Sequence, residues 1–168
     1  AGDFTREVET DAAGNVYVIG GEIPMELRKY NSTGALQWTY STPWDTNGGD
    51  WLGTLATNDA GTSYITQGTG AEIERVDDAG ATYNVLWHNN NSGFSVEYWS
   101  ITFNCDNTKL IVGGTKSSNP LSFPINFWAT IYDIDISNGN VLSQVTLDTT
   151  SFGSGGIPTP VEVRSISS

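Results

Sequence analysis

The sequence repeats itself with a period of 46 to 47 residues, and this period constrains the fold more than any other feature. The segment VETDAAGNVYVIGG at 8–21 returns as LATNDAGTSYITQG at 55–68 and again as ITFNCDNTKLIVGG at 101–114. Gly61 follows Gly14 by 47 residues, and Asn107 follows Gly61 by 46. A fixed period in this range indicates an array of similar structural units.

The second half of the unit repeats as well. LRKYNSTGALQW at 27–38 matches IERVDDAGATYNVLW at 73–87, and YDIDISNGNVL at 132–142 follows the same plan. Gly80 follows Gly34 by 46 residues, whereas Gly139 follows Gly80 by 59, so the third copy carries 13 extra residues. We place the insertion between Gly114 and Asp135, around 117–127.

Each unit predicts four short antiparallel strands. Alternating β-branched and aromatic residues lie between turns rich in Asp, Asn and Gly, as antiparallel hairpins require. Four strands in about 46 residues match one blade of a β-propeller. We therefore predict an all-β chain with three four-stranded antiparallel blades, at about 1–50, 51–97 and 98–150, and the start of a fourth at about 151–168.

A closed propeller needs about four to eight blades. The segment EVRSISS at 162–168 is placed like the first strand of a further blade. We therefore expect these residues to be part of a larger molecule, completed by other blades of its own longer chain or by a partner protein.

The charge of the chain excludes some partners. Seven Lys and Arg against nineteen Asp and Glu give a net charge of -12, which repels nucleic acid and anionic membranes. No apolar run approaches the ~20 residues of a membrane span, so we expect no membrane insertion. The start, AGDFTREVE, lacks a signal-peptide pattern, and the single Cys105 is predicted to be a small buried hydrophobe.

The stretch YNSTGALQW at 30–38 resembles the tryptophan-docking repeats of the PQQ-like propeller superfamily, in which a Thr-Gly turn precedes a strand carrying Trp. Trp38 and Trp87 fit this pattern, and the third copy has no Trp at the matching place. Together with DAAGNVYVIGG, NPLSFPINFWATIYDIDISNGNVL and PTPVEVRSISS, the chain is also similar to large Bacteroidota surface proteins exported by the type IX secretion system. The resemblance implies an extracellular or cell-surface location and an adhesive or scaffold role.

The motifs give little sign of catalysis. The segments DAAGN, NDAGT and CDNTK are better explained as tight turns than as calcium loops, because the EF-hand spacing is missing. Asp133 and Asp135 would share one face of a strand, so ion binding there stays open. His88, the only histidine, is expected in a loop without a catalytic role. We expect no metal and no cofactor, since PQQ would need a closed ring and axial ligands that this segment does not show.

The direction of the strands separates short turns from long connections. Connections between the second and third strands, and between successive blades, emerge on one face, and elaborated loops on a rigid scaffold usually carry binding. On this face we predict contacts to glycan or protein, with packing between blades as the alternative for the aromatic residues. The predicted binding residues are Trp44, Asp45, Asp50, Trp51, Asn89, Asn90, Phe94, Tyr98 and Phe123.

The sequence thus favours a non-catalytic, extracellular or cell-surface propeller segment that acts in adhesion or as a protein- or glycan-binding scaffold. Two alternatives remain. One is part of a propeller enzyme, a glycan lyase or hydrolase, whose remaining blades complete the site; the other is a periplasmic assembly propeller.

Overall fold

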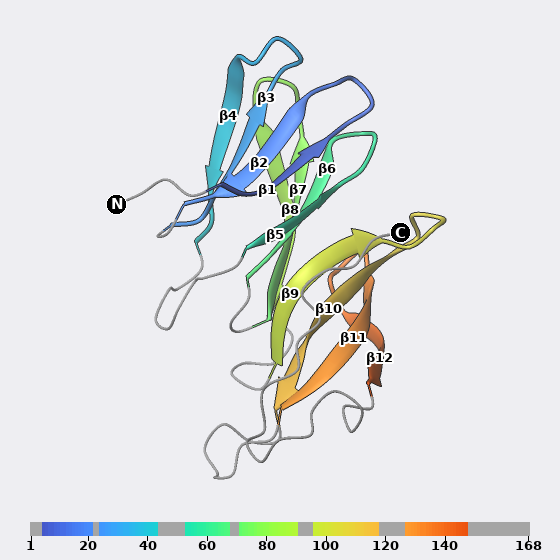
Figure 1. Cartoon of the computed structure of the whole chain (residues 1–168). Helices are drawn as coiled ribbons and strands as arrows, with labels where there is room; N and C mark the ends of the chain where they lie inside the picture. Colours follow the sequence, from blue (N-terminus) through green and yellow to red (C-terminus); the bar gives the residue numbers. More distant parts are fainter. Residues whose placement is uncertain are drawn as a thin grey trace.

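The computed structural model describes residues 5–21, 24–43, 53–67, 71–90, 96–117 and 127–147. These residues form twelve β-strands in three four-stranded antiparallel sheets and include no helix. The predicted all-β fold with three four-stranded blades is confirmed (Figure 1). The predicted start of a fourth blade, 151–168, lies outside the described residues.

The strands of each sheet follow one another in chain order. Blade 1 contains β1 (Thr5–Thr10), β2 (Val16–Gly20), β3 (Glu26–Tyr30) and β4 (Leu36–Ser41). Blade 2 contains β5 (Thr54–Thr57), β6 (Thr62–Thr66), β7 (Glu72–Asp78) and β8 (Tyr83–Asn90). Blade 3 contains β9 (Val96–Phe103), β10 (Lys109–Ser117), β11 (Phe127–Asp135) and β12 (Val141–Thr146). β5 contacts β1 on one side and β9 on the other, so the first strands of the blades adjoin one another.

Turn chemistry explains why the repeated Asp and Asn residues stand where they do. In the β1–β2 turn, Asp11 Oδ1 accepts hydrogen bonds from the amides of Ala13 and Asn15 at 3.0 and 2.9 Å. Asn58 and Asn104 make the same kind of bond in blades 2 and 3. The positive φ that such turns need falls on Gly14, Gly61 and Asn107, at 75°, 81° and 56°. The interpretation of these segments as tight turns is confirmed.

The insertion in the third copy lengthens a hairpin. β10 and β11 have nine residues each, whereas β2 and β3 have five. Nine consecutive pairs join β10 to β11, from Lys109 opposite Asp135 to Ser117 opposite Phe127. Part of the predicted loop at 117–127 is therefore strand, and residues 118–126 lie outside the described part of the chain.

Two apolar cores lie between the described parts of the three blades. Between blades 1 and 2, Tyr17, Ile19 and Leu27 of one sheet pack with Leu55 and Ile65 of the next, all of them fully buried. A second core joins Tyr64 and Ile73 of blade 2 to the side chains of blade 3 that face them. Each described blade therefore buries its apolar side chains against a neighbour, as in other arrays of repeats.

Two residues differ from their predicted environments. Cys105 is exposed, because β9 ends at Phe103 and the cysteine lies in the β9–β10 turn. His88 lies within β8, where its imidazole contacts Glu72, and not in a loop. The prediction for His88 was wrong because β8 extends to Asn90. The prediction for Cys105 was wrong because the residue lies in the CDNTK turn, and no described neighbouring element covers its side chain there.

Candidate functional site

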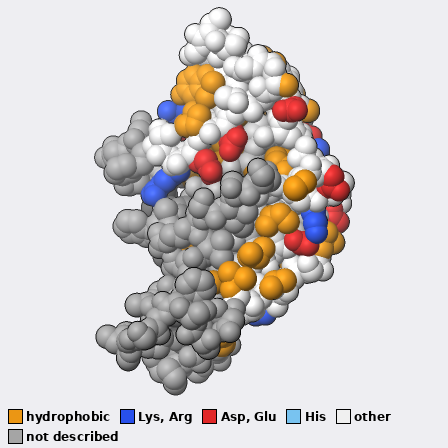
Figure 2. Space-filling view, turned by 45° about the vertical axis from the view of Figure 1, so that its right-hand side comes forward, with side chains coloured by type: hydrophobic (Ala, Val, Ile, Leu, Met, Phe, Trp, Pro, Cys, Tyr) orange, Lys and Arg blue, Asp and Glu red, His pale blue; other side chains and the backbone are white. Residues whose placement is uncertain are grey.

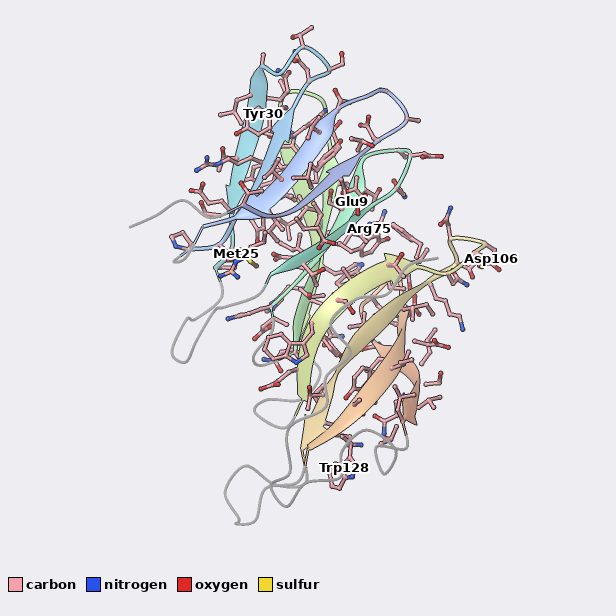
Figure 3. All side chains as sticks on the ribbon, in the orientation of Figure 1. Glu9, Met25, Tyr30, Arg75, Asp106 and Trp128 are labelled. Atoms are coloured by element: carbon pink, nitrogen blue, oxygen red, sulfur yellow. The ribbon has the colours of Figure 1, made fainter. Side chains whose placement is uncertain are left out.

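The topology gives the blades two distinct ends. We call the end with the turns at 11–15, 31–35, 58–61, 79–82, 104–108 and 136–140 the short-turn end. The opposite end, where the connections around 21–26, 41–54, 66–72, 90–96 and 117–127 emerge, is the long-loop end. In blade 3, Asp106 marks the first and Trp128 the second, and they lie at opposite ends of the sheet (Figure 3).

Most of the predicted binding residues lie outside the described residues. These are Trp44, Asp45, Asp50, Trp51, Phe94 and Phe123. The structure places the other three, Asn89, Asn90 and Tyr98, in strands and not in loops.

Tyr98 belongs to the core. Its side chain is fully buried, and its ring packs edge-on against Tyr132 with the centroids 5.3 Å apart. The reason is that β9 begins at Val96, two residues before Tyr98, so the tyrosine already lies in the sheet. For this residue the alternative of packing between blades is correct, and Tyr98 is withdrawn from the binding surface.

Asn89 and Asn90 are the last two residues of β8, and their side chains lie on opposite faces of the sheet. Asn89 Nδ2 donates to Asn138 O and to Asn140 Oδ1 of blade 3, at 3.3 and 2.8 Å. Asn90 Nδ2 donates to Glu72 Oε1 at 2.5 Å on the other side of the sheet. Asn89 therefore helps to join two blades, and Asn90 belongs to the cluster described next.

A group of polar side chains lies between blades 1 and 2 at the long-loop end. We call it the carboxylate–histidine cluster, and its members are Tyr40, Glu72, Glu74, His88 and Asn90. Tyr40 Oη donates to Glu74 Oε2 at 2.5 Å, across 34 residues of sequence. His88 Nε2 contacts Glu72 Oε2, and His88 lies directly opposite Glu74 in the β7–β8 ladder.

Burial controls the electrostatics of this cluster. Glu74 is only 2% exposed, and this desolvation raises the pKa of its carboxyl above the ordinary glutamate value, a rise that Glu72 reinforces. The hydrogen bond from Tyr40 and the proximity of His88 oppose the rise without cancelling it. Burial and the neighbouring Glu74 also raise the pKa of the Tyr40 phenol, which therefore stays a hydrogen-bond donor.

At each described blade interface, a tryptophan indole of one blade donates a hydrogen bond to the next blade. Between blades 1 and 2, Trp38 Nε1 donates to Asp78 Oδ1 at 2.9 Å, and Lys29 Nζ donates to Asp78 Oδ2 at 2.6 Å. The Lys29 and Asp78 side chains are 6% and 16% exposed, so this ion pair is largely withdrawn from water.

Between blades 2 and 3 a main-chain carbonyl takes the place of the carboxylate. Trp87 Nε1 donates to Ile136 O at 3.2 Å, and Arg75 Nη1 and Tyr64 Oη donate longer bonds to the same oxygen, at 3.5 and 3.3 Å. In blade 3 the strand position of Trp38 and Trp87 is taken by Ser143, which lies opposite Asp133. The missing third Trp of the sequence pattern is thus a Ser on the face of blade 3 that points away from blade 2.

The described carboxylates on β11 have local partners. Asp133 accepts from Lys109 Nζ at 2.5 Å and from Ser143 Oγ at 3.0 Å, and these bonds lower its pKa. Asp135 accepts from the amide and hydroxyl of Ser137 in the turn that follows β11. Within the described residues no three His, Cys, Asp or Glu side chains are grouped to hold a metal ion, and no helix could cross a membrane.

One aromatic residue at the long-loop end was missed in the sequence. Trp128 is the second residue of β11, is partly exposed, and lies opposite Lys116. Its position depends on the extension of the β10–β11 hairpin, which the repeat pattern did not reveal because the insertion has no counterpart in the other copies.

Comparisons with known proteins show the fold. No model of a known protein family matches the chain, and no curated protein sequence matches it. A europium-containing methanol dehydrogenase is similar in structure, with 14% identity, a TM-score of 0.59, and coverage of 87% of this chain and 26% of its own.

Two further solved structures agree with this. The quinohemoprotein alcohol dehydrogenase of Comamonas testosteroni has 19% identity and a TM-score of 0.56, over 84% of this chain and 21% of its own. A protein of unknown function from Bacteroides caccae has 16% identity and a TM-score of 0.53, over 79% of this chain and 40% of its own. The chain thus has the β-propeller fold of these structures and spans between about a fifth and two fifths of their length.

Proposed function

We propose that this chain is part of a larger, non-catalytic β-propeller on the cell surface or outside the cell, which binds a protein or glycan through its long-loop end. The separation of the two ends carries the proposal. Short turns closed by their own Asp and Asn side chains occupy one end, and the long connections emerge at the other. Elaborated loops on a rigid scaffold are where binding usually resides.

The outer face of blade 1 supports the idea of a larger ring. Val8 and Val18 form a cross-strand pair, as Leu55 and Ile65 do at the same place in blade 2. Leu55 and Ile65 are fully buried by blade 1, whereas Val8 is 52% exposed. Blade 1 thus presents the apolar surface that elsewhere in this chain meets another blade.

This outer face also contains a pocket. Figure 2 shows that hydrophobic side chains form patches between charged ones on the surface of the described residues. The pocket is lined by Thr5, Val18, Gly20, Gly21, Glu26, Arg28 and Tyr30. A further blade would bury both the pocket and the valine pair. We assign that blade to the same longer protein or to a partner chain.

Binding of the whole protein to a printed array of glycans tests the proposed function. Trp128→Ala at the long-loop end, and Trp44→Ala with Trp51→Ala, are expected to weaken binding about tenfold or more, since truncating an aromatic hot-spot residue costs about 2 kcal/mol or more of binding free energy. Leu142→Ala is the matched control, because Leu142 is 58% exposed near the short-turn end. Equal losses from both ends would contradict the assignment of the binding face.

The carboxylate–histidine cluster favours one alternative, a glycan lyase or hydrolase completed by other blades. A buried carboxyl with a raised pKa beside an imidazole is a pattern of acid–base sites. Glycan turnover by the whole protein, abolished by Glu74→Gln, would establish this alternative.

A further inference from the structure

The carboxylate–histidine cluster is a contact between two blades as well as a group of titratable side chains. Tyr40 belongs to β4 of blade 1, and the other four members belong to β7 and β8 of blade 2. The Tyr40–Glu74 bond is therefore a polar connection between the blades, within a surrounding of fully buried apolar residues that includes Leu27, Ile65 and Val76.

The long connections begin and end at the members of this cluster. Tyr40 is the second-last residue of β4, and the next amide beyond β4, that of Thr42, donates to Met25 O at 2.9 Å. Glu72 O accepts from Gln67 N at 3.1 Å and so closes the connection between β6 and β7. Asn90 is the last residue of β8. A change in the cluster therefore acts where three connections of the long-loop end are anchored.

The titratable groups that face Glu74 come from three strands. β4 supplies Tyr40, β8 supplies His88, and β7 supplies Glu72. Tyr83 at the start of β8 lies against the Tyr40 ring, with the centroids 5.1 Å apart. β6 places the apolar Ile65 opposite Glu74, and Lys29 of β3 is paired with Asp78 at the other end of the interface. Among the described side chains, no Lys or Arg thus faces the Glu74 carboxylate at this end of the interface.

From this geometry we infer that the cluster is a proton-operated latch, which holds blade 1 against blade 2 when Glu74 is protonated and loosens the joint when Glu74 ionises. The inference rests on the proposed function, because the latch regulates the binding face at the long-loop end. A neutral Glu74 leaves no buried charge between the blades and keeps its hydrogen bond with Tyr40. An ionised Glu74 is a buried anion beside Glu72, and its desolvation is offset only in part.

The direction of the pH effect follows from the raised pKa of Glu74. A group whose pKa is higher in the folded than in the unfolded state stabilises the fold below its unfolded pKa, and this contribution is lost as the pH rises through the folded pKa. The joint is therefore tighter in acid and looser towards alkaline pH.

Hydrogen–deuterium exchange of the whole protein without ligand tests the latch. Between about pH 4 and about pH 8, and after correction for intrinsic rates, peptides from β4 and β8 should lose protection relative to peptides from β10 and β11. The protection factor of these peptides should fall about tenfold for each unit by which the pKa of Glu74 is raised. Glu74→Gln, which mimics the neutral acid, should abolish this difference.

Glu26→Gln is the matched control, because Glu26 pairs with Arg28 on the outer face of blade 1 and should leave the pH dependence unchanged. Tyr40→Phe gives an independent measure: it removes the bond that lowers the pKa of Glu74, so the loss of protection should move to higher pH. A pH dependence that persists in Glu74→Gln, or none in the wild type, would overturn the latch. Either result leaves the glycan-binding test untouched, since no ligand is present.

Discussion

At the scale of single residues, Asp78 is the acceptor on which the first blade interface depends. It binds both the Trp38 indole and the Lys29 ammonium, and these three side chains are largely buried. Asp78→Ala would leave Lys29 as a buried cation without its partner. We expect this change to lower the free energy of unfolding by about 3–5 kcal/mol, the usual effect of breaking a buried pair, as measured by urea unfolding of the whole protein.

The matched control is Asp59→Ala, which removes an exposed aspartate from the turn between β5 and β6 of the same blade. Its effect should stay within about 0.5 kcal/mol, as for most surface substitutions. Similar values for the two variants would show that the Asp78 pair contributes nothing beyond an ordinary surface aspartate.

At the scale of elements, the β3–β4 and β11–β12 turns offer a matched pair of glycines. Gly34 and Gly139 both have positive φ, at 84° and 75°, but a Cβ at Gly34 would meet nothing within 4 Å. A Cβ at Gly139 would lie 2.5 Å from the Trp87 ring and 3.0 Å from Asn89 Cβ. We expect Gly34→Ala to lower the free energy of unfolding by roughly 1–2 kcal/mol through backbone strain. Gly139→Ala should lower it by about 1–3 kcal/mol more, because the added Cβ displaces packed neighbours.

Chemical denaturation of both variants measures this difference, and indole fluorescence adds a second readout, since Gly139→Ala alone should disturb the environment of Trp87. If the two substitutions cost the same, the β11–β12 turn is not packed against the Trp87 ring in the way that the structure shows.

At the scale of the whole molecule, the exposed face of blade 1 decides whether the described blades stand alone. If nothing covers that face, Val8→Asp places a charge at a position that is 52% exposed. Such a surface substitution changes the free energy of unfolding only slightly. If a further blade covers the face, the same charge is buried without a partner, and we expect the whole protein to lose more than about 2 kcal/mol of unfolding free energy.

Val85→Asp is the control for this prediction. Val85 lies opposite Val76 on the covered face of blade 2 and yet stays 41% exposed near the rim, so an aspartate there remains hydrated and should cost little. Thermal unfolding of both variants measures the comparison. A small effect at both positions would mean that no blade covers the outer face of blade 1.

Features within one blade could be predicted from the sequence because they depend on residues close together in the chain. The antiparallel hairpins are closed by bonds such as those from Ala13 and Asn15 to Asp11, two and four residues apart. The turn glycines and Asn107 have the positive φ that the pattern predicts. The sequence by itself therefore determined the three blades, the order of their strands and the separation of short turns from long connections.

Only the tertiary structure decided which side chains meet between blades. The Tyr40–Glu74, Trp38–Asp78 and Tyr64–Ile136 contacts span 34, 40 and 72 residues, and no local pattern specifies such partners. The burial of Tyr98 depends likewise on blade 2 covering that face of blade 3. The physical reason is that turn hydrogen bonds form within a few residues, whereas contacts between blades depend on how two twisted sheets are aligned when their apolar faces are buried.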